Sequence, residues 1–118
     1  MPDRDAAIKA VCEAGDLALA AWREGAAPAT GVWEKSKGHP VSETDLAVDA
    51  LLKQRLGALA PNIGWLSEET VDHPDRLSMS RQWLVDPIDG TRDYIRGRSG
   101  WCVSVALVEG SEAVFAAM

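Results

Sequence analysis

Apolar and polar positions along the chain follow two different periods, and they predict two helices followed by a sheet. In residues 4–24 the apolar side chains recur three and four positions apart, as on one face of a helix. The stripe comprises Ile8, Val11, Cys12, Gly15, Ala18, Leu19 and Trp22. Gly25 and Pro28 mark the end of this helix. We interpret the stripe as core packing.

A second helix is predicted to open within residues 41–45. Ser42 and Asp45 have the spacing of a capping box, and Thr44 is an alternative cap. Apolar residues continue the helix until Pro61: Leu46, Val48, Leu51, Leu52, Leu56 and Leu59. Asp45 would lie in the first turn of this helix. A favourable interaction with the helix dipole is by itself a sufficient reason for an acidic residue at that position.

The segment between the helices, residues 25–43, is loop-like, with a short strand candidate at residues 32–34. Residues 35–40 are polar, include Gly and Pro, and carry Lys35 and Lys37. Two interpretations stay open. The segment is an exposed hairpin turn, or it is a mobile loop that brings a lysine near an anion.

Alternating patterns predict strands in the second half of the chain. Residues 62–67 and 82–85 are predicted strands, and the polar residues 70–81 between them are predicted to be a flexible loop with a solvated His73. Both faces of residues 101–108 are largely apolar, so we expect that strand to be buried in a sheet. A turn at residues 109–111 leads into a returning strand from Ala113.

Composition limits the class of protein. The 118 residues make at most one domain, with 47% apolar and 25% charged residues. A net charge of −6 argues against binding to nucleic acid polymers or membrane surfaces. Cys12 and Cys102 lack metal-ligand spacing and lie in apolar runs. We therefore expect buried thiols, a reducing compartment and a cytoplasmic location.

Acidic residues stand where predicted strands end and a helix begins. Asp86 and Asp89 follow one strand, Glu68 follows another, and Asp45 opens the second helix. Carboxylate ligands without nearby His or Cys suit Mg²⁺ or Mn²⁺ rather than Zn²⁺. Because neighbouring side chains of an extended chain point to opposite faces, only one of Glu68 and Glu69 is expected to face the site.

The residues after Asp86 suggest what such a site would do. The turn through residues 86–89 can place both acids on one side, with Pro87 stiffening the chain and the Ile88 carbonyl as a further ligand. If a helix starts at Gly90 and Thr91, its free amides form an anion site. This set of groups suits phosphate-ester hydrolysis: metals neutralise the phosphate and ionise a water molecule, and the amides hold the phosphate oxygens. The alternative is a solvated acidic turn, because Asp-Pro and Asp-Gly are common turn dipeptides.

Residues 83–91, Trp-Leu-Val-Asp-Pro-Ile-Asp-Gly-Thr, resemble the signature of the inositol monophosphatase superfamily. Residues 40–45 resemble its Pro-Val-Thr-x-x-Asp, residues 66–69 its Gly/Ser-Glu-Glu, and residues 101–107 the strand after the signature. The resemblance implies an α+β fold, a layered α/β/α/β sandwich. Residues 1–118 would be a single, truncated N-terminal portion of it, with the helix pair and a mostly antiparallel sheet.

The resemblance also implies an enzyme and its cofactor. It would be a Mg²⁺-dependent, lithium-sensitive phosphatase, with Mn²⁺ as an alternative metal, and a homodimer in full-length form. Glu68, Asp86 and the Ile88 carbonyl would hold the metal that activates water. Asp86 and Asp89 would hold a second metal, for which a later segment of the family supplies another Asp.

Catalytic roles are implied for residues outside the metal ligands. Thr91, paired with Asp45, would orient or deprotonate the attacking water, and the Gly90 and Thr91 amides would bind the phosphate. Glu69 would support the metal site from outside the set of direct metal ligands. Lys35 or Lys37 would correspond to the mobile-loop lysine of the family.

The substrate class stays open between a small phosphate monoester, inositol monophosphate, and adenosine 3′,5′-bisphosphate. Residues 92–94, Arg-Asp-Tyr, resemble the Lys-Glu-Phe of 3′(2′),5′-bisphosphate nucleotidases more than the Thr-Asn-Phe of inositol phosphatases. Arg92, Arg96 and Arg98 would meet a second phosphate or face solvent. A third reading is a non-catalytic binding module with the same fold.

Overall fold

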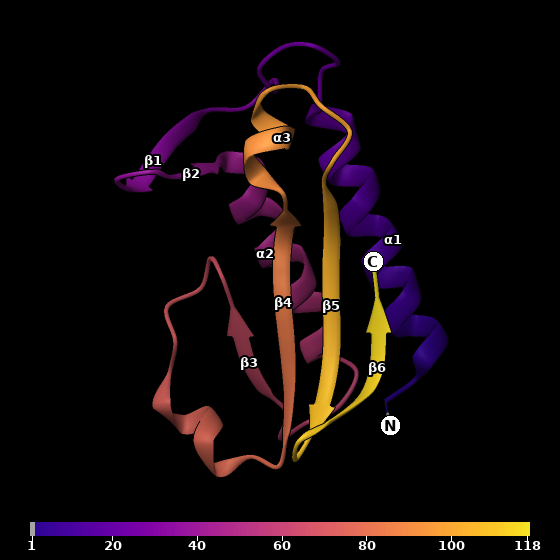
Figure 1. The fold of residues 1–118 in the computed structure, drawn as a ribbon. Helices are drawn as coiled ribbons and strands as arrows, with labels where there is room; N and C mark the ends of the chain where they lie inside the picture. The colour runs from indigo at the N-terminus through magenta and orange to yellow at the C-terminus, as the bar shows by residue number, and fades with distance from the viewer. Residues whose placement is uncertain (1) are drawn as a thin grey trace.

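The computed structural model describes residues 2–118 and shows an α+β fold with two long helices, a hairpin and a four-stranded sheet (Figure 1). The elements are α1 (Arg4–Ala21), β1 (Val32–Ser36), β2 (His39–Ser42), α2 (Glu43–Gly57), β3 (Gly64–Ser67), the 3₁₀ helix η1 (Pro74–Ser78), β4 (Arg81–Asp89), α3 (Thr91–Ile95), β5 (Cys102–Glu109) and β6 (Glu112–Ala117). The sheet order is β3-β4-β5-β6, with β3 parallel to β4 and the other neighbours antiparallel. The predicted fold class is confirmed.

Helices α1 and α2 lie against the same face of this sheet (Figure 1). The inward residues of β5, Val103, Val105 and Leu107, are buried, whereas the alternating residues from Cys102 to Val108 are partly exposed. Strand β5 lies inside the sheet between β4 and β6, as expected, but only one of its two apolar faces is buried. Among residues 2–118 the helices cover only one face of the sheet.

Helix α1 forms where it was predicted, and its buried face overlaps the predicted stripe only at Val11 and Ala18. Small residues fill the contact with α2 and the sheet: Ala7, Ala10, Val11, Ala14 and Ala18. Ile8 and Leu19, which were predicted to be core residues, are 42% and 56% exposed. Alanine allows the helix backbone to approach its neighbours closely, and this contact rotates the buried stripe away from the larger side chains.

Helix α2 begins with the predicted capping box. The Asp45 amide donates to Ser42 Oγ at 3.2 Å, and the Asp45 carboxylate accepts from the Ser42 amide at 2.8 Å. Val48, Leu52 and Leu56 are fully buried, but Leu46 is exposed. The helix ends at Gly57, before the proline at position 61.

The connecting segments correct two further expectations. Cys12 is exposed on α1 and Cys102 is half-buried on the uncovered side of the sheet, so neither is a fully buried thiol. The loop after β3 contains η1, while His73 beside it is exposed as predicted. No helix within residues 2–118 is long and apolar enough to cross a membrane.

Candidate active site

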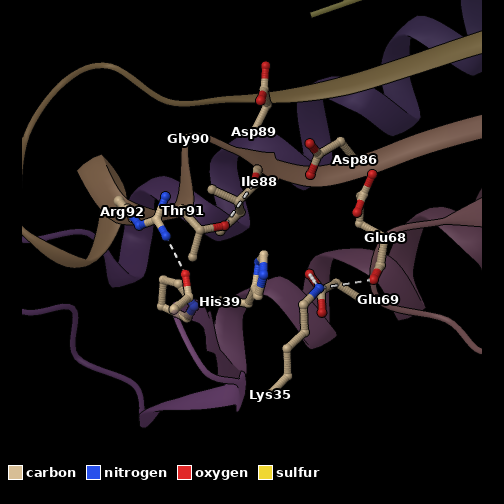
Figure 2. A pocket seen from close by; sticks show the side chains of 12 residues that line it. Lys35, His39, Glu68, Glu69, Asp86, Ile88, Asp89, Gly90, Thr91 and Arg92 are labelled. Carbon is tan, nitrogen blue, oxygen red and sulfur yellow. Dashed lines mark hydrogen bonds and ion pairs between the residues drawn. The ribbon is translucent and has the colours of Figure 1, made fainter.

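A cleft of about 440 Å³ opens where the carboxyl ends of β3 and β4 meet the β1–β2 hairpin (Figure 2). Because β3 and β4 are parallel, their ends lie at the same edge of the sheet. The cleft is lined by Lys35, Gly38, His39, Pro40, Glu68, Glu69, Asp86, Ile88, Asp89, Gly90, Thr91 and Arg92. Every predicted site residue is therefore at the cleft except Asp45, which is fully buried next to Thr91.

A bulge in β4 places Asp86 and Asp89 on one side of the sheet. Asp86 pairs with Ser104 and Asp89 with Cys102, so three steps along β4 match two steps along β5. In a regular strand, residues three apart would face opposite sides. The extra residue in the bulge shifts the alternation by one position, so both acids face the same side. Pro87 lies within the bulge, where its missing N–H costs no ladder hydrogen bond.

Glu68 and Glu69 both line the cleft, and the expectation that only one of them would face it was wrong. Strand β3 ends at Ser67, so strand alternation does not apply to the two acids. The Glu69 carboxylate forms an ion pair with Lys35 Nζ at 3.2 Å and is itself almost fully buried. Burial raises the pKa of Glu69, and the bond to Lys35 lowers it by a smaller amount.

Asp86 is the focus of negative charge in the cleft. Its pKa is raised to about 6, first by burial and then by the charges of Asp89, Glu68, Asp45 and Glu69. A divalent cation would relieve this repulsion, and the carboxylate oxygens of Asp86, Asp89 and Glu68 are donors of the kind that Mg²⁺ prefers. Within residues 2–118, however, no three acidic, His or Cys side chains converge as a ready metal cluster. Figure 2 shows the Asp86 and Glu68 carboxylates close together, with the Asp89 carboxylate pointing away from them.

Thr91 joins the cleft to helix α2. Its hydroxyl lies 3.0 Å from Asp45 Oδ1 and 3.0 Å from the Ile88 carbonyl oxygen. A hydroxyl donates one proton, so the two acceptors share it. The Ile88 side chain is buried in the core, and its carbonyl oxygen accepts from Thr91; the metal-ligand role of this carbonyl stays a prediction.

Gly90 allows the abrupt turn from β4 into α3. Its φ is +88°, and a Cβ at this position would lie 2.4 Å from the Gly100 carbonyl oxygen. Only glycine satisfies both conditions without strain. The predicted helical segment after Gly90 is α3, which spans five residues.

Two basic side chains, Lys35 and Arg92, also line the cleft. Lys35 lines the cleft and Lys37 is absent from the residues that line it. Arg92 also lines the cleft and donates to the Gly38 carbonyl oxygen of the hairpin turn. Arg96 and Arg98 are exposed and lie outside the cleft-lining set.

Two residues near the site were missed by sequence reasoning. His39 lines the cleft from the start of β2, but a histidine in a polar turn carries no distinctive signal. Asp49 lies on α2 four residues after Asp45 and contacts the segment of Glu68 and Glu69 through hydroxyl groups. Its spacing from Asp45 places both acids on one helix face, and this was the available signal.

Solved structures share this arrangement of elements. The IMPase of Thermotoga maritima aligns with a TM-score of 0.77 and 27% identity over 95% of this chain and 41% of that chain. A CysQ from Bacteroides thetaiotaomicron, described as a bacterial member of the inositol monophosphatase family, aligns with a TM-score of 0.74 and 28% identity over 97% of this chain and 40% of that chain.

Curated relatives carry several names. A Streptomyces griseus protein named glucose-1-phosphate thymidylyltransferase is 41% identical over 91% of this chain and 41% of its own length. A histidinol-phosphatase of Chlorobaculum parvum is 35% identical over 93% of this chain and 41% of its own length. A 3′(2′),5′-bisphosphate nucleotidase CysQ of Haemophilus influenzae is 37% identical over 68% of this chain and 30% of its own length.

The chain thus spans less than half the length of these relatives, and their names do not agree on a substrate. The family assignment does not depend on those names. The profile described as the Inositol monophosphatase family matches residues 2–118, which include the acidic cleft and the Asp45–Thr91 pair. The chain belongs to the inositol monophosphatase family.

Proposed function

We propose that this chain forms part of a Mg²⁺-dependent phosphatase that hydrolyses a small phosphate monoester by direct attack of water. The observation that carries the proposal is the Thr91 hydroxyl, which lies 3.0 Å from the buried Asp45 carboxylate at the edge of an acidic cleft. A hydroxyl held by a buried acid next to metal-type oxygen donors is suited to orienting a water molecule.

Glu68, Asp86 and the Ile88 carbonyl would hold one cation, and Asp86 with Asp89 would hold a second. The raised pKa of Asp86 supports this assignment, because after burial its causes are the negative charges of neighbouring carboxylates, first Asp89 and Glu68. When bound, a divalent cation supplies neutralisation of the phosphate charge and lowers the pKa of a water molecule. Mn²⁺ has the same preference for oxygen ligands and is the alternative metal for the site.

The side chains of this chain would do the remaining work. The Thr91 hydroxyl proton is shared by Asp45 and the Ile88 carbonyl oxygen, so the lone pairs of Oγ1 can accept a hydrogen bond from the attacking water and direct the water oxygen toward phosphorus. The backbone amides of Gly90 and Thr91, at the start of α3, would hold the phosphate oxygens. Lys35 would limit the negative charge of the cleft through its contact with Glu69.

The leading substrate is inositol monophosphate, and adenosine 3′,5′-bisphosphate is the second candidate. The second is supported by the CysQ relatives and by the position of Arg92, whose guanidinium lies at the cleft. Lithium sensitivity, a homodimer and a cytoplasmic location complete the proposal. The first two rest on membership of the family, and the location rests on the two free cysteines.

Phosphate release by the native-length protein tests the proposal. We expect Mg²⁺-dependent release that EDTA abolishes and lithium inhibits. Inositol 1-phosphate, adenosine 3′,5′-bisphosphate and histidinol phosphate would be compared at equal concentration. The relative rates of phosphate release rank the three compounds as substrates. Mg²⁺ binding without release from any small phosphate monoester would favour a non-catalytic binding module and overturn the enzyme proposal.

A further inference from the structure

Helix α2 carries a second buried acid one turn after Asp45. Asp49 is 7% exposed and does not line the cleft. It accepts hydrogen bonds from two hydroxyl groups, Ser67 Oγ at 2.5 Å and Thr70 Oγ1. Ser67 is the last residue of β3, and Thr70 follows Glu69. The two hydroxyls therefore bracket Glu68 and Glu69 in the chain.

Each hydroxyl also accepts a hydrogen bond from the segment that it anchors. The Glu69 amide donates to Ser67 Oγ at 3.2 Å, and Trp65 Nε1 donates to Thr70 Oγ1 at 3.1 Å. The hydroxyl protons are thereby directed to Asp49. A buried carboxylate is stable only when hydrogen bonds satisfy it, so this set of contacts favours one conformation of residues 67–70.

Other contacts of Glu68 and Glu69 are weaker anchors. The Glu68 amide donates to the Val85 carbonyl oxygen at 3.2 Å and so extends the β3–β4 pairing by one bond. Lys35 Nζ donates to the Glu69 carboxylate at 3.2 Å and to the Glu68 carbonyl oxygen at 3.3 Å, but its own side chain is 39% exposed and comes from the β1–β2 hairpin rather than from a helix. The buried contact with Asp49 is the one that joins the two glutamates to a rigid helix.

We propose that Asp49 is a positioning residue that holds Glu68 and Glu69 in place for cation binding, and this rests on the proposed function. Asp45 contacts Thr91, and Asp49 contacts the segment of Glu68, from positions about 6 Å apart along α2. One helical turn thus sets the separation between the water-orienting pair and the Glu68 side of the site. The carboxylate acts by bridging two hydroxyls, without contact to substrate or metal.

The test compares Asp49→Ala and Asp49→Asn in the native-length protein, with Asp16→Ala on the exposed face of α1 as the matched control. Asparagine can still bridge the hydroxyls, because its oxygen accepts from one and its amide donates to the other. We expect Asp49→Ala to raise the Kd for Mg²⁺ roughly 10- to 100-fold by calorimetry, as loss of outer ligand-orienting contacts does. Asp49→Asn should stay within about threefold of wild type, and Asp16→Ala should not change.

Amide hydrogen exchange provides a readout that does not depend on metal. Asp49→Ala should lose protection at Glu69 and shift the Trp65 indole N–H resonance, while α1 and β5 keep their protection. Unchanged Mg²⁺ affinity and Glu69 protection in Asp49→Ala would overturn the proposal, as would Asp49→Asn behaving like alanine. If Asp49→Ala does not fold, Thr70→Val, which removes one hydroxyl, must show the same local loss.

The two proposals fail separately. Wild-type protein that binds no Mg²⁺ would contradict the proposed phosphatase, and the exchange experiment would still decide whether Asp49 holds residues 67–70. Wild-type protein that binds Mg²⁺ and hydrolyses a phosphate ester, with an unaffected Asp49→Ala variant, would contradict only the role of Asp49.

Discussion

The Thr91 hydroxyl lies 3.0 Å from the Asp45 carboxylate, although 46 residues separate the two in the chain. Asp45 Oδ1 contacts Thr91, while Oδ2 accepts from the Ser42 amide at 2.8 Å and from Ser42 Oγ at 2.6 Å. One carboxylate therefore caps helix α2 with one oxygen and holds Thr91 with the other. Substitution of Asp45 disturbs both functions, whereas substitution of Thr91 disturbs only one.

Thr91→Val is the sharper test of the water-orienting pair, since it removes the hydroxyl and keeps the side-chain shape. We expect kcat to fall about 10²- to 10⁴-fold, the range typical of a lost proton-transfer or water-orienting group, with little change in KM. Thr91→Ser keeps the hydroxyl and should stay within about tenfold of wild type. Steady-state kinetics on the preferred substrate measures both. Equal activity of Thr91→Val and wild type would remove Thr91 from the mechanism.

Asp86→Asn should weaken Mg²⁺ binding without unfolding the protein. The raised pKa of Asp86 shows that its charge is unfavourable in the metal-free cleft, so a neutral amide costs no stability there. We expect Mg²⁺ affinity to fall at least about tenfold by calorimetry, while Tm without metal stays equal or rises. Asp75→Asn, in the exposed 3₁₀ segment, is the control. Tight Mg²⁺ or Mn²⁺ binding by Asp86→Asn would contradict its role as a ligand.

The Asp86 carboxyl also predicts how the stability of the protein depends on pH. The pKa of Asp86 is raised from 3.8 to about 6 on folding, so the folded state binds more protons than the unfolded state between these values. The free energy of unfolding of the metal-free protein should therefore fall as pH rises from about 4 to 6. Stabilisation by Mg²⁺ should grow over the same interval, because protons compete for the carboxylates. Thermal unfolding with and without Mg²⁺ measures both trends, and Asp86→Asn should flatten them.

Gly90→Ala should destabilise the turn into α3 more than a comparable substitution elsewhere. The new Cβ would meet the Gly100 carbonyl oxygen at 2.4 Å, in addition to the cost of the positive φ. Gly110 has a φ of +61°, and no heavy atom lies within 4 Å of an added Cβ. Gly110→Ala is therefore destabilised only by the positive φ. We expect urea unfolding to show a loss of about 1 to 3 kcal/mol for Gly110→Ala and a larger loss for Gly90→Ala. Equal losses would show that the Gly100 contact relaxes freely.

Several features of the site were predictable because they depend on neighbouring residues. The Ser42–Asp45 capping box is defined by a spacing of three, and the strand before Asp86 by a short apolar run. Glu68, Asp86 and Asp89 line one cleft, as expected from acids placed at strand ends. The buried face of α1 was not predictable in the same way. Its large apolar residues suggested one stripe, and close packing against α2 selected the alanine stripe beside it.

The sequence by itself determined the order of helices and strands, the cap of α2, the oxygen-donor chemistry of the cleft and the resemblance to a phosphatase family. These properties depend on residue type and short spacing. Tertiary structure alone decided that Lys35 rather than Lys37 reaches the cleft, that Glu68 and Glu69 both line it, and that Asp49 anchors their segment. Such relations join residues far apart in the chain, and they depend on how α2, the hairpin and the β4 bulge pack together.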